Sequence, residues 1–138
     1  MLSLDVIWTD PDLVECRVRA ASESFAASAD IYFTVESLRE FADAVVGFPT
    51  SAKDHREFAS ENSPSVGNSF RLLLDCVDDA AHAVATVELS DREDSPQSAV
   101  VRFPVYASDV DQFESALRTM SATEKGSAAL GSAAPVSA

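Results

Sequence analysis

The fold is decided by residues 98–120, which read SAVVRFPVYASDVDQFESALRTM. Over 98–106 the apolar residues follow the period of two that is typical of a β-strand, and Pro104 places this strand at a sheet edge or a bulge. From 108 onward the apolar residues are spaced three or four apart, as one stripe of an α-helix. The stripe comprises Val110, Phe113, Leu117 and Met120. A strand followed at once by an amphipathic helix indicates an α+β unit.

The same order of elements occurs earlier in the chain. Three strands are predicted by runs of alternating character over 2–8, 13–20 and 25–35, and a helix by the pattern over 36–47. Three more strands are predicted over 69–77, 82–89 and 98–106, before the second helix. The sequence therefore predicts an α+β fold with strand-strand-strand-helix twice. We expect a mainly antiparallel sheet of about six strands, carrying two helices in a two-layer sandwich.

The first helix has signals at both ends. Ser37 with Glu40 three residues later is a candidate capping box, and Thr34 is an alternative N-cap. Gly47 and Pro49 are expected to end the helix, because glycine adopts the left-handed conformation readily and proline cannot continue a helix.

The chain of 138 residues is the size of one domain, which we place at residues 1–121. The polar connection over 50–68 is long, and we expect a helical turn near 54–60 with Phe58 docked on the core. Residues 122–138 are rich in Ala, Ser and Gly and lack aromatic residues. This composition predicts a mobile or disordered tail.

The formal net charge of −13, with 23 acidic against 10 basic residues, limits the classes of partner. Phosphate-rich surfaces are bound by clustered Lys and Arg, so we expect neither nucleic acid nor anionic membrane as a partner. No apolar run approaches the roughly 20 residues of a membrane-spanning helix, and the N-terminus does not resemble a secretory signal. A cytoplasmic location with Cys16 and Cys76 as buried, reduced thiols is the expectation.

The sequence offers no recognisable catalytic set, metal-ligand spacing or phosphate-binding glycine loop, so we assign no catalytic residue, metal or cofactor. His82 is the main alternative, because it follows an acidic turn with Asp75, Asp78 and Asp79 and could centre a small enzyme or a metal-dependent domain. His55 lies beside acidic residues too, but no sequence motif fixes a nucleophile for it.

Residues 70–89, which read FRLLLDCVDDAAHAVATVEL, resemble a family of small uncharacterised bacterial α+β proteins, as do Leu38–Phe41 and Gly47–Pro49. In that family a helix ends in a glycine-aromatic step and is followed by a hairpin with an acidic turn. The resemblance covers roughly residues 13 to 120. Some similar small domains accompany bacterial toxins as immunity proteins, so the resemblance implies a role in binding a protein.

Acidity and resemblance together predict a protein-binding module that occludes a basic partner, of which a toxin is one example. The predicted partner-binding residues are the acids at two turns: Asp75, Asp78, Asp79, Asp91, Glu93 and Asp94. Tyr32, with Asp30 and Thr34, is a candidate aromatic anchor if it faces solvent. A structural homodimer, formed through an edge strand such as 98–106 or an exposed sheet face, is a further alternative.

Overall fold

The described part of the chain, residues 1–60, 67–78, 82–91 and 96–131 of the computed structural model, contains eight strands and two helices. The strands are β1 (Leu2–Thr9), β2 (Val14–Ala21), β3 (Ala26–Phe33), β4 (His55–Ala59), β5 (Ser69–Cys76), β6 (Ala83–Asp91), β7 (Gln97–Val105) and β8 (Ser127–Leu130). The helices are α1 (Val35–Val45) and α2 (Ala107–Thr123). Neither described helix has the length and apolar character needed to cross a membrane.

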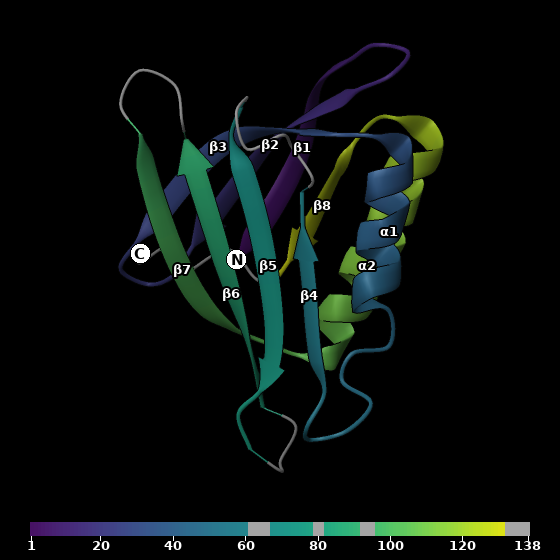
Figure 1. Ribbon diagram of the computed structural model, residues 1–138. Coiled ribbons are helices and arrows are strands. Elements are labelled where there is room, and N and C mark those ends of the chain that lie inside the picture. Colours follow the sequence, from purple (N-terminus) through teal and green to yellow (C-terminus); the bar gives the residue numbers. More distant parts are fainter. Residues whose placement is uncertain (61–66, 79–81, 92–95, 132–138) are drawn as a thin grey trace, which may run out of the picture.

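The strands form two antiparallel sheets of four. The first sheet has the order β3-β2-β1-β8 and the second has the order β4-β5-β6-β7. The sheets face each other with their strands crossing obliquely, and the two helices lie side by side at one flank (Figure 1). The predicted α+β class, with antiparallel strands and two helices, is confirmed. The predicted single layer of about six strands is wrong, because the core lies between two sheets.

The two halves of the chain exchange their fourth strands. β4 follows α1 but pairs with β5 of the second sheet, and β8 follows α2 but pairs with β1 of the first sheet. Each sheet is therefore a three-stranded meander completed by a short strand from the other half. This arrangement places α1 against β4 and α2 against β8, so the helices close the flank where these two edge strands lie.

β4 replaces the helical turn that the sequence predicted near 54–60. Its five residues pair in antiparallel register with β5, from His55 opposite Asp75 to Ala59 opposite Arg71. Phe58 is buried as predicted, while its neighbours Glu57 and Ala59 are exposed, which is the period of a strand. The turn was predicted wrongly because the hydrogen bonds offered by β5 cannot be read from the local sequence.

β8 lies inside the segment predicted to be a mobile tail. Its four residues pair with β1, from Ser127 opposite Asp5 to Leu130 opposite Leu2, and Ala128 and Leu130 are buried. The prediction is therefore wrong for 127–130, and residues 132–138 lie outside the described residues. The apolar contacts stabilising β8 come from α2 and β1, not from the composition of the tail.

Replacing Leu130 with alanine is expected to lower the free energy of unfolding by about 2 kcal/mol, at the low end for such a substitution because β8 is short and at an edge. Urea denaturation measures the change. Ala129→Ser, at an exposed position of the same strand, is the matched control and is expected to stay within about 0.5 kcal/mol. An effect of Leu130→Ala no larger than that of the control would contradict the docking of β8.

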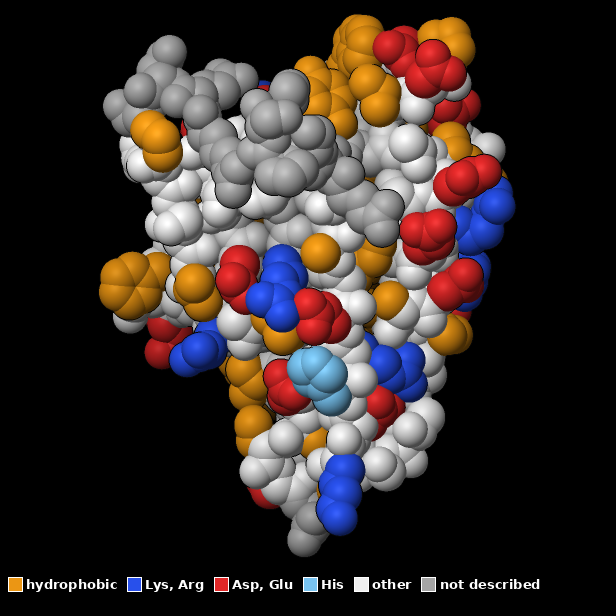
Figure 2. Space-filling model, viewed as in Figure 1, with side chains coloured by type: hydrophobic (Ala, Val, Ile, Leu, Met, Phe, Trp, Pro, Cys, Tyr) orange, Lys and Arg blue, Asp and Glu red, His pale blue; other side chains and the backbone are white. Residues whose placement is uncertain are grey.

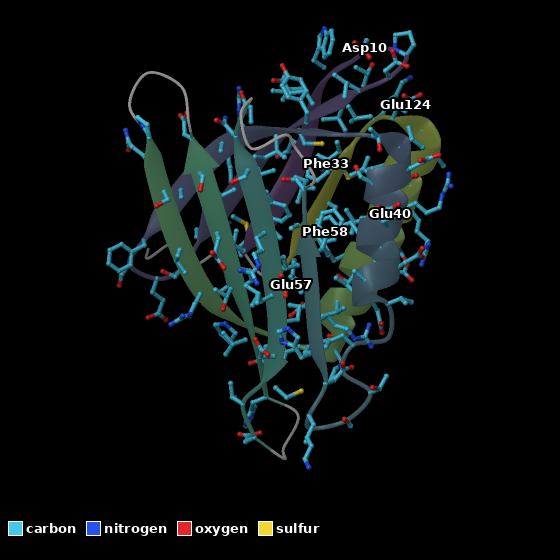
Figure 3. All side chains as sticks on the ribbon, viewed as in Figure 1. Asp10, Phe33, Glu40, Glu57, Phe58 and Glu124 are labelled. Carbon is cyan, nitrogen blue, oxygen red and sulfur yellow. The ribbon has the colours of Figure 1, made fainter. Side chains whose placement is uncertain are left out.

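Aromatic side chains fill the centre of the core. Phe33 and Phe58 point into the space between the sheets (Figure 3). The ring of Phe41, from α1, stacks on the ring of Phe58 with 4.2 Å between centroids, and it also contacts Phe70 and Phe113 at 5.6 and 5.3 Å. One residue of α1 thus joins both helices to the second sheet.

α1 is capped at both ends by residues outside it. Thr34 is the N-cap: its hydroxyl accepts from the Ser37 N–H at 2.9 Å, and the Ser37 hydroxyl accepts from the Thr34 N–H at 2.8 Å. The capping box is therefore formed by Thr34 and Ser37, one turn before the predicted box of Ser37 and Glu40, and the alternative N-cap, Thr34, is the one observed. At the other end, the Arg56 guanidinium of β4 donates to the backbone oxygens of Ala44 and Val46 at 3.2 and 2.8 Å.

Candidate interaction site on the first sheet

Of the six acidic residues predicted to bind a partner, the three that the structure describes, Asp75, Asp78 and Asp91, do not form one patch. Asp75 and Asp78 lie at the end of the second sheet where β5 leads toward β6, and Asp91 lies at the opposite end of β6. Nine residues of β6 separate the two ends by about 26 Å, from a rise of roughly 3.3 Å per residue. Asp79, Glu93 and Asp94 lie outside the described residues.

His82 is exposed and not packed into the core. Its Nδ1 lies 2.7 Å from a carboxylate oxygen of Asp78. Within the ranges that the structure describes, no three His, Cys, Asp or Glu side chains are placed to hold a metal ion. The described surroundings of His82 therefore provide an ion pair with one carboxylate.

The outer face of the second sheet carries charges that pair with each other. His55 Nδ1 lies 2.5 Å from Asp75, and this hydrogen bond is the main cause of a raised pKa for His55. The guanidinium of Arg71 lies between Glu57 at 2.7 Å and Glu88 at 3.5 Å. Acidic, basic and histidine side chains are adjacent at the centre of this face (Figure 2). Such a face offers little unbalanced charge to a partner.

The two cysteines are free thiols. Cys16 is buried as predicted, and its pKa is raised to about 12, first by burial and then by the carboxylates of Asp5 and Glu15. Cys76 is half-buried, and its Sγ lies 3.4 Å from the backbone oxygen of Ser51. A thiol with a raised pKa is a poor nucleophile at neutral pH, so Cys16 has the properties of a core residue.

The outer face of the first sheet combines exposed aromatic residues with charge. Trp8 pairs with Glu15 across β1 and β2, and Glu15 pairs with Tyr32 across β2 and β3, so the three form one row. The register shifts between Val6 and Trp8, which leaves Ile7 as the extra residue of a bulge. Side chains alternate along a strand, so without this shift Trp8 would point into the core.

The aromatic side chains of this row are accessible, and Glu15 lies between them. Trp8 is 49% exposed and Tyr32 is 40% exposed, whereas Glu15 is half-buried. Adjacent strands lie about 5 Å apart, so the two aromatic residues are about 10 Å from each other. That separation leaves space for a planar cation over the carboxylate.

Among the described residues, the Glu15 side chain makes no hydrogen bond or ion pair. The nearest guanidinium along its strand, that of Arg17, is bound to Asp30 by contacts of 3.0 and 3.4 Å. A half-buried carboxylate has lost part of its hydration, and an incoming cation can compensate that loss. The row therefore has the chemistry of a site for an ammonium or guanidinium group.

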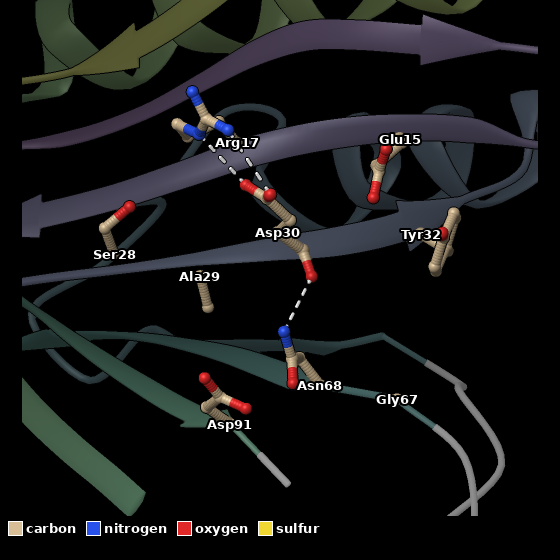
Figure 4. Close-up of a pocket in the computed structure, with 9 residues that line it drawn as sticks. All are labelled: Glu15, Arg17, Ser28, Ala29, Asp30, Tyr32, Gly67, Asn68 and Asp91. Atoms are coloured by element: carbon tan, nitrogen blue, oxygen red, sulfur yellow. Dashed lines mark hydrogen bonds and ion pairs between the residues drawn. The ribbon is translucent and has the colours of Figure 1, made fainter. Parts of the chain in front are cut away.

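A hollow of about 340 Å³ adjoins this row, where β3 meets the beginning of β5 and the end of β6. It is lined by Glu15, Arg17, Ser28, Ala29, Asp30, Tyr32, Gly67, Asn68 and Asp91. The Asn68 Nδ2 donates to the backbone oxygen of Asp30 at 3.1 Å, and this hydrogen bond links the two sheets beside the hollow (Figure 4). Three carboxylates and one guanidinium line the hollow, so negative charge predominates.

The hollow and the row beside it include some of the residues that the sequence predicted to bind a partner. They also include residues for which the sequence predicted no such role. Tyr32 and Asp30 are exposed to it, as the hypothesis of an aromatic anchor required, and Asp91 lines it. Trp8 and Glu15 were missed as candidates: the bulge redirects Trp8, and Glu15 has the pattern of an ordinary solvent-facing strand residue.

Comparisons with known proteins show no family. No family model matches the chain, and no curated protein matches it. Among solved structures, the chain is similar to that of the plant transcriptional regulator PBF-2, with 12% sequence identity and a TM-score of 0.47. This similarity covers 86% of the present chain and 71% of the other.

Proposed function

We propose that this protein is a protein-binding module that recognises a basic partner through the outer face of its first sheet. The observation that carries the proposal is the half-buried carboxylate of Glu15, which has no ion pair in the described structure and lies between the exposed Trp8 and Tyr32. Occlusion of a basic protein such as a toxin, as in immunity proteins, is the form of this function that the chain's acidity favours.

Charge and aromatic side chains contribute to binding in different ways: net charge speeds association, and the aromatic side chains supply contacts in the bound state. The net charge of −13 attracts a basic protein and speeds association, and at physiological salt this attraction acts mainly within a screening length of about 8 Å. At contact, a cationic side chain between two aromatic rings gains cation–π attraction, and the carboxylate beneath it adds a charge-assisted hydrogen bond. Aromatic anchors of this kind carry much of the binding energy in protein interfaces.

Two alternative functions, one centred on His82 and one a homodimer through β7, have less support from the described residues. A function centred on His82 would use an exposed histidine with one described carboxylate partner, Asp78, whereas the first-sheet row offers three side chains of complementary chemistry. A homodimer through β7 would use an edge strand that contains Pro104, which cannot donate to a strand ladder.

Glu15→Gln is expected to weaken binding to a partner about tenfold, and Trp8→Ala about 30-fold, because each removes one component of the cation site. The full chain is used to capture proteins from the native cell, captured proteins are identified by mass spectrometry, and the affinity of the purified partner is measured by calorimetry. Glu88→Gln, which makes the same charge change on the second sheet, is the matched control and is expected to leave the affinity unchanged.

The result that would overturn the proposal is an affinity that none of these substitutions changes. A labelled single-stranded oligonucleotide serves as a second probe, and we expect no binding at physiological salt because acidic residues predominate. Tight binding of the oligonucleotide would contradict a function directed at basic proteins.

A further inference from the structure

We infer that Arg19 is a second contact of the same binding surface: it binds a carboxylate of the partner, about 13 Å along β2 from the cation held over Glu15. This inference rests on the proposed function and adds the direction in which the partner lies on the first sheet. Three observations carry it: the order of charges along β2, the side chains beside Arg19 and the net charge of the chain.

The outer face of β2 carries three charged side chains at every second position of the strand. These are Glu15, Arg17 and Arg19, and all three project from the same face because side chains alternate along a strand. Arg17, in the middle, is bound to Asp30 by contacts of 3.0 and 3.4 Å. In the described structure the side chains of Glu15 and Arg19 make no hydrogen bond or ion pair. β2 therefore presents one uncompensated negative charge and one uncompensated positive charge, four residues apart.

Arg19 lies between two serine side chains. Ser3 of β1 and Ser28 of β3 are directly opposite it in the antiparallel register, and Ala129 of β8 follows Ser3 in the same row. Opposite residues lie about 5 Å apart, so the two hydroxyl groups flank the base of the Arg19 side chain. Neither hydroxyl group makes a hydrogen bond within the described ranges. A carboxylate at this row meets the forked N–H donors of a guanidinium with hydroxyl donors beside them.

Among the described residues, no carboxylate of this chain is paired with the Arg19 guanidinium. The nearest acids in the register are Asp5 and Asp30, and both lie opposite Arg17, one row away. Asp30 is bound to Arg17, and Asp5 makes no ion pair with Arg19. On the other side of the row Ala21 has a small side chain, and Arg19 is exposed. An incoming carboxylate therefore reaches the guanidinium without breaking an ion pair.

The distance between the two charges defines the segment that fits them. Residues i and i+4 of an extended peptide are also about 13 Å apart, and their side chains project to the same side. A partner segment with a basic residue at one position and an acidic residue four positions away therefore matches both charges when it lies along β2. The reverse direction brings like charges together, which disfavours it. Arg19 sets orientation more than affinity, because an ion pair at an exposed guanidinium contributes little.

The net charge of the chain makes the role of Arg19 testable by the sign of an effect. The chain carries −13, so the loss of any exposed positive charge strengthens the long-range attraction of a basic partner. Arg19→Gln would tighten binding slightly if Arg19 acted only through net charge, whereas it weakens binding if Arg19 holds a carboxylate. Arg102→Gln is the matched control, because Arg102 is exposed on the second sheet, opposite Thr86, and makes no ion pair in the described structure.

The probe is a blocked pentapeptide with arginine first, aspartate last and three serines between, titrated into the full chain and followed by NMR shifts. The comparison peptide has asparagine in place of aspartate. We expect the wild-type chain to prefer the aspartate peptide about fivefold, Arg102→Gln to keep this preference and Arg19→Gln to lose it. A peptide with one serine between its charges, which spans about 7 Å, is expected to show no such preference. Circular dichroism checks that both variants fold.

The outcomes separate this inference from the function on which it rests. If the wild-type chain binds the aspartate and asparagine peptides equally, or if the preference survives Arg19→Gln, the carboxylate contact is wrong. The cation site stands in that case when Glu15→Gln still weakens binding of both peptides. A preference that Arg19→Gln abolishes, with no effect of Glu15→Gln on either peptide, would contradict the proposed function and the direction inferred from it. If Arg19→Gln fails to fold, the comparison of the two peptides on the wild-type chain decides alone.

Discussion

Phe41→Ala is expected to lower the free energy of unfolding by about 4 kcal/mol, in the middle of the range for removing a buried aromatic ring. Phe41 is fully buried, and its ring contacts Phe58 of β4, Phe70 of β5 and Phe113 of α2. The substitution leaves a cavity at the point where both helices meet the second sheet, and surrounding elements that are themselves paired in sheets cannot move to fill it. Urea denaturation followed by circular dichroism measures the effect.

Two further variants test the cause of this loss. Phe41→Leu refills part of the space and is expected to cost about half as much. Phe25→Ala removes the same ring at a site that is 73% exposed and is expected to change the free energy by less than about 0.5 kcal/mol. A loss below about 1 kcal/mol for Phe41→Ala would contradict the packing of α1 onto β4 and β5.

The importance of Phe41 could be predicted from the sequence, because the evidence for it is local. The spacing of Leu38, Phe41, Ala42 and Val45 predicts a buried stripe of a helix, and all four side chains are buried. The six longer strands were predicted for the same reason: each has enough residues for its alternation to be visible. The strand over 98–106 was expected at a sheet edge or a bulge because of Pro104, and β7 is an edge strand of the second sheet.

The arrangement of these elements could not be predicted, because it depends on pairing between distant parts of the chain. β8 reads Ser127-Ala128-Ala129-Leu130, a composition typical of a flexible tail, and it becomes a strand because β1 supplies backbone partners and α2 covers it. β4 depends on β5 in the same way. Without these two exchanged strands the prediction of one six-stranded layer was the simplest one consistent with the pattern.

The candidate site was hidden from the sequence by two effects. A one-residue bulge at Ile7 reversed the direction of Trp8, and bulges have no strong sequence signal when glycine is absent. The number of acidic residues in the sequence also does not show which carboxylates form ion pairs in the folded chain. Asp75 and Asp78 were predicted to bind a partner, and in the structure they pair with His55 and His82. Glu15 was overlooked, yet it makes no ion pair among the described residues.

The second large effect is expected from Arg56→Ala, which should lower the free energy of unfolding by about 3 kcal/mol. The guanidinium makes two contacts with the Asp54 carboxylate, at 2.8 and 3.0 Å, and donates to the backbone oxygens of Ala44 and Val46. The side chains of Arg56 and Asp54 are only 21% and 9% exposed. Removing Arg56 therefore leaves a largely buried carboxylate without its cation and the end of α1 without its donors.

Arg118→Ala is the matched control, because Arg118 also bridges elements but does so at the surface. Its guanidinium pairs with Asp43 at 3.0 Å and with Glu114 at 3.2 Å, and the Arg118 and Asp43 side chains are exposed. Exposed pairs contribute between roughly 0 and 1 kcal/mol, so its loss should be small. Equal losses for the two arginine variants would contradict the structural role assigned to Arg56.

The dependence on pH separates the two contributions of Arg56. Hydrogen bonds from Arg56 are the main cause of lowering the pKa of Asp54 from 3.8 to about 2, with those from Thr50 adding to the effect. A carboxyl group with a lowered pKa in the folded state adds stability that is fully present above its unfolded pKa and is lost as the pH falls through the folded value. Because the unfolded state is the same in both proteins, the difference in unfolding free energy between wild type and Arg56→Ala should be constant well above the folded-state pKa of Asp54 in either protein and should shrink as the pH falls toward 2. The part that remains at low pH measures the hydrogen bonds to α1, because the backbone oxygens do not titrate. A difference that is the same at every pH would mean that Asp54 contributes nothing and that Arg56 acts on the helix alone.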